Sequence, residues 1–358
     1  MRVEQLDIHQ FRNLHDAHLT LSPHLTLVVG HNAQGKTNAL EALHLVLQGR
    51  SFRTSPEHDW FPITGPDFCA VSATATSATG AIETIQHRVS GSPRRRIHRG
   101  PKIPVVMFSP DDLNLSKGSP SDRRRFLDLT LCALNPRYDK ALRQYQHALL
   151  QRNRALKDPR LAGTVESFTP AMVSQGFYLW QERARILAPL TARARLVHER
   201  ITRGDTLAME LHYGGSPMPI ESLDAYHDAL RERIADERLR MVSLVGPHRD
   251  DLELRVAGRL ATSFASQGQH RALALSLKLA TFDLLKEELG ESPVILLDDV
   301  LSELDPPRRQ ELLSVISHDG QQTIITDTEA RSYQHLDPTI YQVHGGVFHR
   351  WDETREDT

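Results

Sequence analysis

The sequence predicts an α/β fold in which a phosphate-binding type of loop, an antiparallel β meander and an inserted α-helical arm belong together. Two observations support this prediction. The stretch Gly30-His31-Asn32-Ala33-Gln34-Gly35-Lys36-Thr37 matches the pattern G-x-x-x-x-G-K-[ST]. Strand-like runs precede about residue 106, helical periodicity fills about residues 120 to 240, and strand character returns at Leu252.

The G-x-x-x-x-G-K-[ST] loop has the neighbours that phosphate binding requires. It follows the apolar run Leu25–Val29, which predicts a buried parallel strand, and it precedes residues 38–47, where apolar side chains at 40, 43 and 47 have helical spacing. In this context the backbone N–H groups wrap the phosphates of a nucleotide, Lys36 reaches the β and γ oxygens, and Thr37 ligates Mg²⁺. An ordinary glycine-containing turn is the alternative, and the flanking strand and helix disfavour it.

The N-terminal region has the pattern of antiparallel strands. Residues 2–29 alternate between apolar and polar side chains, which predicts an opening β meander, and residues 68–106 contain runs rich in Thr, Val and Ile broken at three glycines. A cluster of arginines lies at or beside one predicted hairpin tip: Arg94, Arg95 and Arg96, with Arg99 close by. Such a cluster is either a solvated charge run or a finger that contacts phosphates, and we predict the finger.

A helical arm is predicted to interrupt the domain that contains the phosphate-binding loop, which we call the head. Apolar residues three and four apart predict helices over residues 123–135, 138–157, 167–203 and roughly 220–240. The predicted domains are residues 1–108 for the N-terminal part of the head, 109–242 for the helical arm or lid, and 243–358 for the C-terminal part of the head. Arg123, Arg124 and Arg125 open the first helix, where they are either solvated surface or contacts to a polyanion.

The net charge of −2 conceals a strong asymmetry along the chain. Residues 88–160 contain 17 Lys and Arg against 6 Asp and Glu, a balance of +11, so the remaining residues carry −13. This separation predicts that one surface meets a polyanion while another does not.

A second cluster of chemistry-bearing residues occurs late in the chain. Residues 294–297 are an apolar run that ends in two carboxylates, Asp298 and Asp299. Beside a phosphate-binding loop, one such acid is expected on the Mg²⁺ side and its neighbour is placed to orient or deprotonate water. A turn or helix cap would explain either acid alone, but explains poorly why two acids end the run.

Other compositional features narrow the classes of protein to which the chain can belong. Cys69 and Cys132 lack the spacing of a disulfide framework or a zinc site, and we assign no catalytic metal beyond Mg²⁺. Neither a leader sequence nor an apolar run of 18 residues is indicated, so we expect a cytoplasmic location and no membrane partner.

The combination and order of several motifs resemble one family. The motifs are Phe11-Arg12-Asn13, Gly35-Lys36-Thr37-Asn38, Leu40-Glu41-Ala42, Ser51-Phe52-Arg53, Ser109-Pro110-Asp111-Asp112-Leu113, Arg123-Arg124-Arg125-Phe126-Leu127-Asp128, Gln151-Arg152-Asn153, Gly246-Pro247-His248-Arg249-Asp250-Asp251, Ser266-Gln267-Gly268-Gln269 and Leu297-Asp298-Asp299-Val300-Leu301-Ser302-Glu303-Leu304-Asp305. In their order and combination the chain is similar to the RecF family of bacterial DNA replication and repair proteins, which belongs to the SMC-like ABC-type ATPases.

The resemblance implies an ABC-type ATPase head and a set of roles. Lys36, Asp298 and Asp299 would be catalytic, with Asp298 as the Walker B acid and Asp299 at the position of the catalytic base, while Thr37 and Asp298 would hold Mg²⁺. The residues implied to bind ATP are Arg12, Gly30, His31, Asn32, Ala33, Gln34, Gly35, Lys36, Thr37, Asn38, the signature residues Ser266, Gln267, Gly268 and Gln269, and Asp305 of the D-loop. Ala33 stands where the family usually has glycine, and the Q-loop glutamine has no counterpart in Ser109-Pro110-Asp111.

The resemblance also implies a function. Proteins of this kind bind double-stranded DNA when ATP-bound, dimerise around two nucleotides, hydrolyse ATP slowly, and work with RecR and RecO to place RecA at gaps. The DNA contacts would come from Arg94–Arg96 and Arg123–Arg125. Two alternatives stay open at this point: the ATPase subunit of an ABC transporter, and an ATP-locked DNA scaffold that does not hydrolyse ATP.

Overall fold

A computed structural model describes most of the chain. The described residues are 1–53, 57–62, 65–77, 79–91, 95–202, 209–214, 222–256, 258–316, 320–330, 333 and 336–351. The backbone packs into two compact units: unit 1 comprises Met1–Asp111 and Leu285–Thr358, and unit 2 comprises Asp112–Leu284. Each unit is described separately below.

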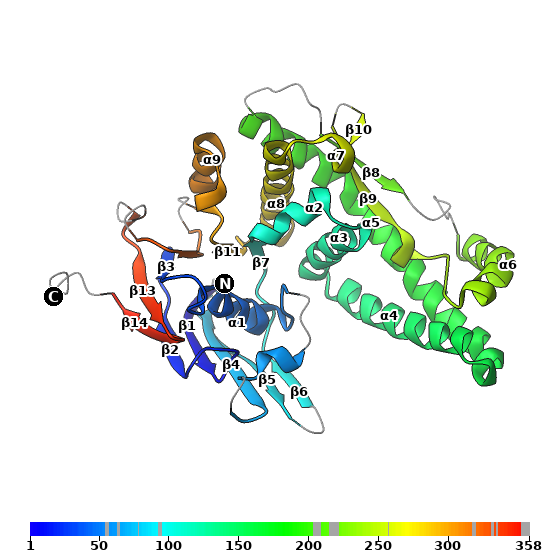
Figure 1. Ribbon diagram of the computed structural model, residues 1–358, viewed down its shortest axis with the longest axis horizontal. Coiled ribbons are helices and arrows are strands. Elements are labelled where there is room, and N and C mark those ends of the chain that lie inside the picture. Colours follow the sequence, from blue (N-terminus) through cyan, green and yellow to red (C-terminus); the bar gives the residue numbers. More distant parts are fainter. Residues whose placement is uncertain are drawn as a thin grey trace. The chain divides into compact units, whose positions relative to one another are not determined.

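Unit 1 is built from two sheets and two principal helices (Figure 1). Its elements are β1 (Arg2–His9), β2 (Ala17–Thr20), β3 (Leu25–Val29), α1 (Lys36–Gln48), β4 (Phe68–Thr76), β5 (Ile82–Ser90), β6 (Arg95–Arg99), β7 (Val105–Phe108), β11 (Val294–Asp298), α9 (Pro306–Ile316), β12 (Thr323–Asp327), β13 (Thr339–His344) and β14 (Val347–Arg350).

The first sheet has the strand order β14-β13-β3-β12-β11-β7. All its neighbouring pairs are parallel except the β13–β14 hairpin. Every residue of β3 and β11 is buried, as expected of parallel strands covered on both faces. Because the carboxyl ends of parallel strands meet at one edge, the residues after Val29, Asp298 and Asp327 come together there.

The second sheet is antiparallel, with the order β2-β1-β4-β5-β6. The predicted opening meander is therefore right for β1 and β2 but wrong for the third run, because β3 leaves this sheet for the parallel one. A fully apolar strand can be buried on both faces, and only the parallel sheet offers that environment. Similarly, β7 pairs with β11 instead of continuing the hairpins.

Helix α1 contacts strands of both sheets, and its buried side chains join the core between them (Figure 1). Eleven of its thirteen residues are buried, so it is a core helix with little amphipathic character. It begins directly after Gly35 and ends at Gly49, which has φ +70° and whose N–H donates to the carbonyl of Leu45. A glycine is favoured at this helix end because left-handed backbone carries little penalty without a Cβ. The core thus fixes the helix that follows the loop.

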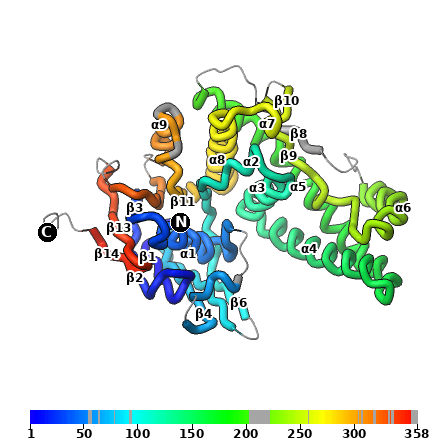
Figure 2. Tube along the Cα trace, in the orientation of Figure 1, coloured from blue at the N-terminus to red at the C-terminus, as the bar shows by residue number. Residues whose placement is uncertain are grey.

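Unit 2 is mainly helical, and Figure 2 traces its long helices in succession. Its elements are α2 (Asn114–Lys117), α3 (Pro120–Leu134), α4 (Pro136–Lys157), α5 (Val165–Thr202), β8 (Met209–Gly214), α6 (Leu223–Arg240), β9 (Asp251–Val256), β10 (Arg259–Leu260), α7 (Ala261–Phe264) and α8 (Gln267–Leu289), the last of which continues into unit 1. Asn135 and Ser222 cap α4 and α6 with their side chains, and the four predicted helices are present.

Two features of unit 2 differ from the sequence prediction. Strand β8 lies within the expected arm, and it pairs with β9 in an antiparallel sheet ordered β10-β9-β8. Residues 243–284, expected to belong to the head, pack with the arm in one compact unit. The pairing with β8 explains this difference, because it ties the returning chain to the arm before the chain reaches unit 1. The sequence Gly214-Gly215-Ser216-Pro217 predicts a loop before the last of the four predicted helices; Gly214 ends β8, and residues 215–217 lie outside the described residues.

Among the described residues, no helix is both long enough and apolar enough to span a bilayer.

A buried ion pair fastens α4 to α6 in unit 2. The Arg152 Nη2 atom lies 2.6 Å from Glu237 Oε2, and the two side chains are 1% and 0% exposed. Arg152 also donates to the hydroxyls of Thr169 and Ser243, and Glu237 accepts from the backbone N–H of Leu244. Each guanidinium nitrogen and each carboxylate oxygen of the pair therefore has a hydrogen-bond partner, which is the condition for a buried charge to persist.

We expect Arg152→Met to lower the free energy of unfolding by about 3–5 kcal/mol, because it leaves the Glu237 carboxylate buried without its cation. Arg154→Met is the matched control: Arg154 is exposed on the same helix, and a surface substitution changes stability by about 0.5 kcal/mol or less. Urea unfolding of both variants provides the measurement. Equal midpoints for the two would contradict the role given to the buried pair.

Candidate functional site

The loop between β3 and α1 has backbone that only certain residues fit. A Cβ added to Gly30 would lie 2.5 Å from the carbonyl oxygen of Val343, so the loop passes too close to β13 for any side chain. Gly35 has φ +116°. Ala33 has φ +65°, a left-handed conformation that costs a residue with a Cβ roughly 1–2 kcal/mol. His31, Asn32 and Ala33 form the exposed rim of this loop.

Lys36 is the first residue of α1, and its ammonium lies inside the loop. Its Nζ donates to the carbonyl oxygens of Gly30, at 2.6 Å, and of His31, at 3.1 Å, and the residue is 7% exposed. The adjacent helix N-terminus contributes unpaired N–H groups and a partial positive charge. A cation and a helix N-terminus in one loop are the combination that favours a phosphate group.

Asp298 is held by two hydroxyl groups at the carboxyl edge of the parallel sheet. Its Oδ1 accepts from Thr37 Oγ1 and from Thr326 Oγ1, each at 2.8 Å, so one oxygen connects α1, β11 and β12. Burial raises the pKa of Asp298 above its usual value, although both hydrogen bonds and the charge of Arg53 oppose the rise. The structure thus brings together the two residues predicted to hold Mg²⁺.

The donor set at this edge fits Mg²⁺. The ion prefers hard oxygen ligands and usually takes one or two protein groups, keeping water and substrate phosphates for the remaining positions. The Thr37 hydroxyl and Asp298 carboxylate are such groups. Within the described residues no cluster of three or more His, Cys, Asp and Glu side chains could hold a metal ion.

Asp299 leaves the strand in an unusual conformation. Its φ is +53°, which aspartate tolerates better than most residues, and its N–H donates to the carbonyl of Thr326 at 3.1 Å. Ser302 Oγ donates to the Asp299 carbonyl at 3.0 Å and lies 3.3 Å from its Oδ1. Backbone strain of this kind concentrates at functional sites. Asp298 is buried while Asp299 is half-buried, so the two acids have different environments.

Asp327 is a third carboxylate at the same sheet edge. It pairs in register with Val29, the residue before the loop, and its Oδ2 accepts a hydrogen bond from the Tyr333 hydroxyl. Burial and this contact raise the pKa of Tyr333. In the sequence, the signal for this acid is the polar end of the run Thr323-Ile324-Ile325-Thr326.

Glu41 is the largest omission from the sequence prediction of the site. It lies on α1, is fully buried, and accepts from Arg12, Ser51 and Arg53. The Arg12 guanidinium makes a two-pronged contact, with Nε–Oε2 at 2.7 Å and Nη2–Oε1 at 2.8 Å. Asn38 joins the same network by accepting from Arg53 Nη1. A single buried carboxylate therefore gathers three separate sequence motifs beside the loop.

The C-terminal hairpin also contacts the loop, which the sequence did not predict. The N–H groups of Gly345 and Gly346, in the turn between β13 and β14, donate to the Gln34 side chain and carbonyl. A Cβ on Gly346 would lie 2.0 Å from the carbonyl of Asn13. Two glycines in a turn were visible in the sequence, but nothing local indicated which part of the chain they approach.

The predicted signature residues lie in unit 2, at the start of α8. Ser266 and Gln269 form a reciprocal cap: the Ser266 N–H donates to Gln269 Oε1 at 2.8 Å, and the Gln269 N–H donates to Ser266 Oγ at 3.3 Å. Gln267 and Gly268 lie in the first turn, so α8 begins earlier than expected. In unit 1, Asp305 precedes α9, and its carboxylate accepts from the N–H and guanidinium of Arg308.

The arginine cluster of α3 is largely used within the protein. Arg123 is 6% exposed, and its guanidinium contacts both carboxylate oxygens of Asp251. Arg124 donates to the carbonyl of Asp250 at 2.6 Å. The prediction that Arg123 contacts DNA is therefore wrong, because a buried and doubly paired guanidinium is not available to phosphates; for Arg124 and Arg125, both half-buried, it stays a prediction.

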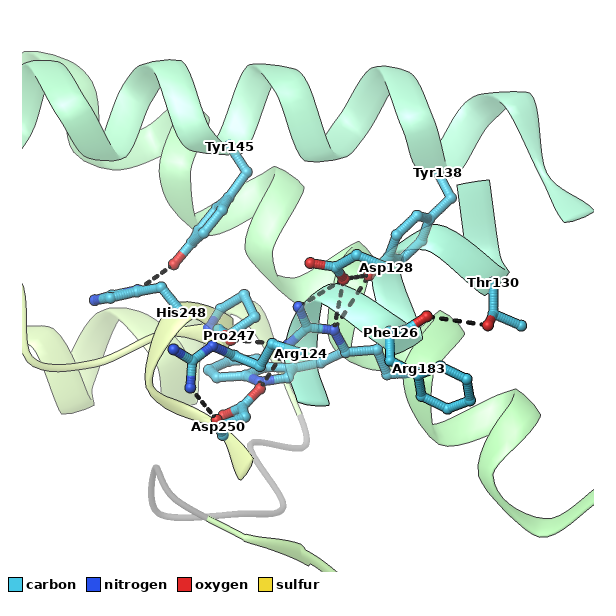
Figure 3. Close-up of polar contacts among 11 residues, drawn as sticks. Arg124, Phe126, Asp128, Thr130, Tyr138, Tyr145, Arg183, Pro247, His248 and Asp250 are labelled. Carbon is cyan, nitrogen blue, oxygen red and sulfur yellow. Dashed lines mark hydrogen bonds and ion pairs between the residues drawn. The ribbon is translucent and has the colours of Figure 1, made fainter. Parts of the chain in front are cut away.

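Figure 3 shows the polar contacts around Arg124 and Asp250. Arg183, 2% exposed, pairs with Asp128 at 2.8 Å and Asp250 at 3.1 Å and donates to the carbonyl of Pro247. His248 lies 2.5 Å from the Tyr145 hydroxyl, and burial lowers its pKa to about 4. These contacts fasten the Gly246–Asp251 loop to α3, α4 and α5.

The second arginine cluster lies on a strand. Arg94 is outside the described residues, while Arg95 and Arg96 begin β6, beside the connection from β5, as expected of residues next to a hairpin tip. Both are exposed, but the Arg96 guanidinium donates to the carbonyl of Gly49 at the end of α1. Adjacent residues in a strand face opposite sides, so the two arginines differ in availability.

We expect Asp298→Asn to stabilise the protein without nucleotide but to weaken Mg²⁺-dependent nucleotide binding. A raised pKa in the folded state means that ionised Asp298 opposes folding above that pKa, and that the opposition disappears as the pH falls through it. Asparagine retains an acceptor for the two threonine hydroxyls, but loses a charge-assisted contact of about 1.5–3 kcal/mol, roughly ten- to a hundredfold in affinity.

Calorimetric titration of ATP with and without Mg²⁺, together with urea unfolding in a chelator, provides the test. Asp299→Asn, one residue along, is the control and should retain affinity for Mg²⁺–nucleotide. Unchanged affinity in Asp298→Asn would remove this residue from the ion site.

Comparison with known proteins agrees with this geometry. A family model described as an AAA domain matches residues 5–102. The DNA replication and repair protein RecF of Symbiobacterium thermophilum is 40% identical over 350 residues, covering 92% of each chain, and that of Halalkalibacterium halodurans is 35% identical over 370 residues, covering 97% of this chain and 98% of the other.

Solved structures extend the comparison to the fold. The recombination mediator protein RecF-ATP in the RecFOR pathway has a TM-score of 0.85 at 27% identity, with 98% of each chain covered. The Smc head bound to the C-winged helix domain of ScpA has a TM-score of 0.55 at 15% identity and shares the fold alone. The fold is thus that of an ABC-type ATPase head with a helical arm, and the chain belongs to the RecF family of DNA replication and repair proteins.

Proposed function

We propose that this protein is an ATP-dependent, DNA-binding recombination mediator. It binds double-stranded DNA in its ATP-bound state, forms a homodimer around two nucleotides, and hydrolyses ATP slowly with stimulation by DNA. With RecR and RecO it helps to load RecA at gaps during DNA repair and replication restart. The names of the relatives support a role in DNA repair. They are DNA replication and repair proteins, and one similar structure is of RecF-ATP in the RecFOR pathway.

The observation that carries the ATP assignment is the meeting of Lys36, Thr37 and Asp298 at one sheet edge. The Lys36 ammonium would exchange its two carbonyl acceptors for the β and γ oxygens of the nucleotide. Thr37 and Asp298 would hold Mg²⁺, which neutralises charge developing on the transferred phosphoryl group. A base or positioning group is also needed for the attacking water, and Asp299 is the half-buried acid at the same strand end.

The other residues predicted to contact ATP differ in how well their positions suit that role. Gly30 and Gly35 shape the loop, and Gln34 is fixed by the C-terminal turn. Arg12 is turned toward Glu41, so it would meet a nucleotide only through N–H groups not engaged by that carboxylate. Asp305 would contact the partner protomer's nucleotide from the D-loop, beside its contacts with Arg308.

Dimerisation is proposed from the family arrangement, in which the signature turn of one protomer completes the nucleotide site of another. Ser266 is exposed at the start of α8, where unpaired N–H groups favour an anion. The Ser266–Gln269 cap would hold this turn in a fixed shape for the partner protomer's γ-phosphate. A two-fold homodimer would contain two such sites.

Asp299→Asn should retain ATP binding but lose about 10²- to 10⁴-fold in hydrolysis, because the neutral amide cannot accept a proton from water. It should also prolong the ATP-bound complex on duplex DNA. Phosphate release with and without DNA, and binding to labelled duplex in ATP and in ADP, test the proposed function together. Wild-type hydrolysis in Asp299→Asn would place the base elsewhere, and nucleotide-independent DNA binding would reject the ATP switch.

Ser266→Arg should bind ATP yet stay monomeric, since a guanidinium side chain would enter the space needed by the partner's phosphates. Sedimentation with a non-hydrolysable ATP analogue measures the association, and ATP affinity of the monomer controls for folding. The dimer proposal fails if the wild type stays monomeric at saturating analogue.

A further inference from the structure

The outward face of strands β5 and β6 is unusually uniform in charge. The two strands pair antiparallel at one edge of the five-stranded sheet, with Gln86 opposite Arg99, Arg88 opposite Ile97 and Ser90 opposite Arg95. In β5 the buried residues alternate with exposed ones, so one face points to the core and the other to solvent. We call the solvent-facing positions of the two strands the edge face: Ile82, Thr84, Gln86, Arg88, Ser90, Arg95, Ile97 and Arg99.

Three arginines and no acid occupy the edge face. Arg88, Arg95 and Arg99 are all exposed. The one acid in the two strands, Glu83, lies two residues before the buried Ile85, in phase with the buried residues of β5, and thus belongs to the core-facing side. Within the part of the chain that the structure describes, no carboxylate forms an ion pair with any of the three arginines. Their charges are therefore not neutralised by the protein itself.

The sheet fixes the spacing of these charges. Arg95 and Arg99 are four residues apart on one strand, roughly 13 Å, and Arg88 lies one strand away, roughly 4.8 Å, opposite the position between them. Phosphates follow one another at about 3.4 Å of axial rise on each DNA strand. A row of this length can therefore reach separate phosphates of one backbone.

Two contacts distinguish these arginines from their neighbours. The Arg88 guanidinium lies 5.3 Å from the centre of the Phe68 ring, which limits its conformations and so reduces the entropy lost on binding. Arg96, next to Arg95, has the opposite alternation and donates to the carbonyl of Gly49. The pleat thus places Arg95 and Arg96 on opposite faces, and Arg88 and Arg99 share the face of Arg95.

We propose that the edge face binds the sugar-phosphate backbone of duplex DNA through Arg88, Arg95 and Arg99. This inference rests on the proposed function for the identity of the polyanion. Charge complementarity favours a phosphate backbone, because the face combines three unpaired cations with Thr84, Gln86 and Ser90, whose hydroxyl and amide groups donate to phosphate oxygens. An acidic protein is the competing partner, and β6 as a charged edge that prevents sheet-to-sheet association is the competing structural role.

The test compares three variants with the same number of substitutions. Arg88, Arg95 and Arg99 are changed together to Gln or together to Lys, and the control changes Arg231, Arg233 and Arg238, which are exposed on α6, to Gln. The affinity of each for labelled duplex DNA is measured with ATP across a salt series. Each phosphate contact contributes about −0.9 to the slope of log affinity against log salt, so the edge-face Gln variant should have a slope shallower by roughly 2 to 3.

The Lys variant and the α6 control should keep a slope close to that of the wild type, and all variants should keep the wild-type affinity for ATP. An unchanged slope in the edge-face Gln variant overturns the inference while leaving the proposed function intact. Self-association of that variant with unaltered DNA binding also overturns the inference, because the arginines then act as a charged edge. Loss of binding to polyglutamate with unaltered binding to DNA overturns it as well, because the partner is then an acidic protein. If the wild type fails to bind duplex in any nucleotide state, the proposed function fails and this inference fails with it.

Discussion

One buried carboxylate oxygen organises the candidate site. Asp298 Oδ1 accepts from Thr37 on α1 and Thr326 on β12, while Asp298 itself ends β11. Three elements distant in sequence are therefore registered to one another at the sheet edge by two hydrogen bonds. Burial raises the pKa of the acid, which means that holding the charge there opposes stability. A loss of stability from a buried carboxylate is understandable where the carboxylate serves a cation, since bound Mg²⁺ would favour the ionised form.

A second carboxylate complements the first from the other side of the loop. Glu41 is buried on the same helix as Thr37 and gathers Arg12 and Arg53. Arg53 also acts on Asp298, because its charge favours the ionised form of that acid. The two carboxylates are thus linked through one arginine. This arrangement explains why motifs separated by tens of residues occur together. Each motif supplies a side chain that pairs with a charge buried in another motif.

The predictable parts of the fold were those with strong local signals. The loop before α1, the helices of unit 2 and the apolar strand ending in Asp298 all follow from spacing within a few residues. The membership of the second sheet did not, because the partners of its strands are provided by pairing between residues distant in sequence. Strand β8 was missed for the same reason, as its pairing partner β9 lies beyond α6. Likewise Glu41 and the Gly345–Gly346 turn acquire their roles only through contacts distant in sequence.

The arginine clusters show what composition can and cannot establish. Residues 88–160 carry a clear excess of positive charge, but that excess contains residues in opposite situations. The Arg123 guanidinium forms an ion pair with Asp251 inside unit 2. Arg95 is exposed on an edge strand and has no ion pair among the described residues. Desolvation separates the two cases: a buried guanidinium requires a fixed carboxylate, while an exposed one can exchange water for a phosphate. The net charge of a segment therefore predicts a polyanion partner, and only the pleat and the burial pattern identify which of its arginines are exposed.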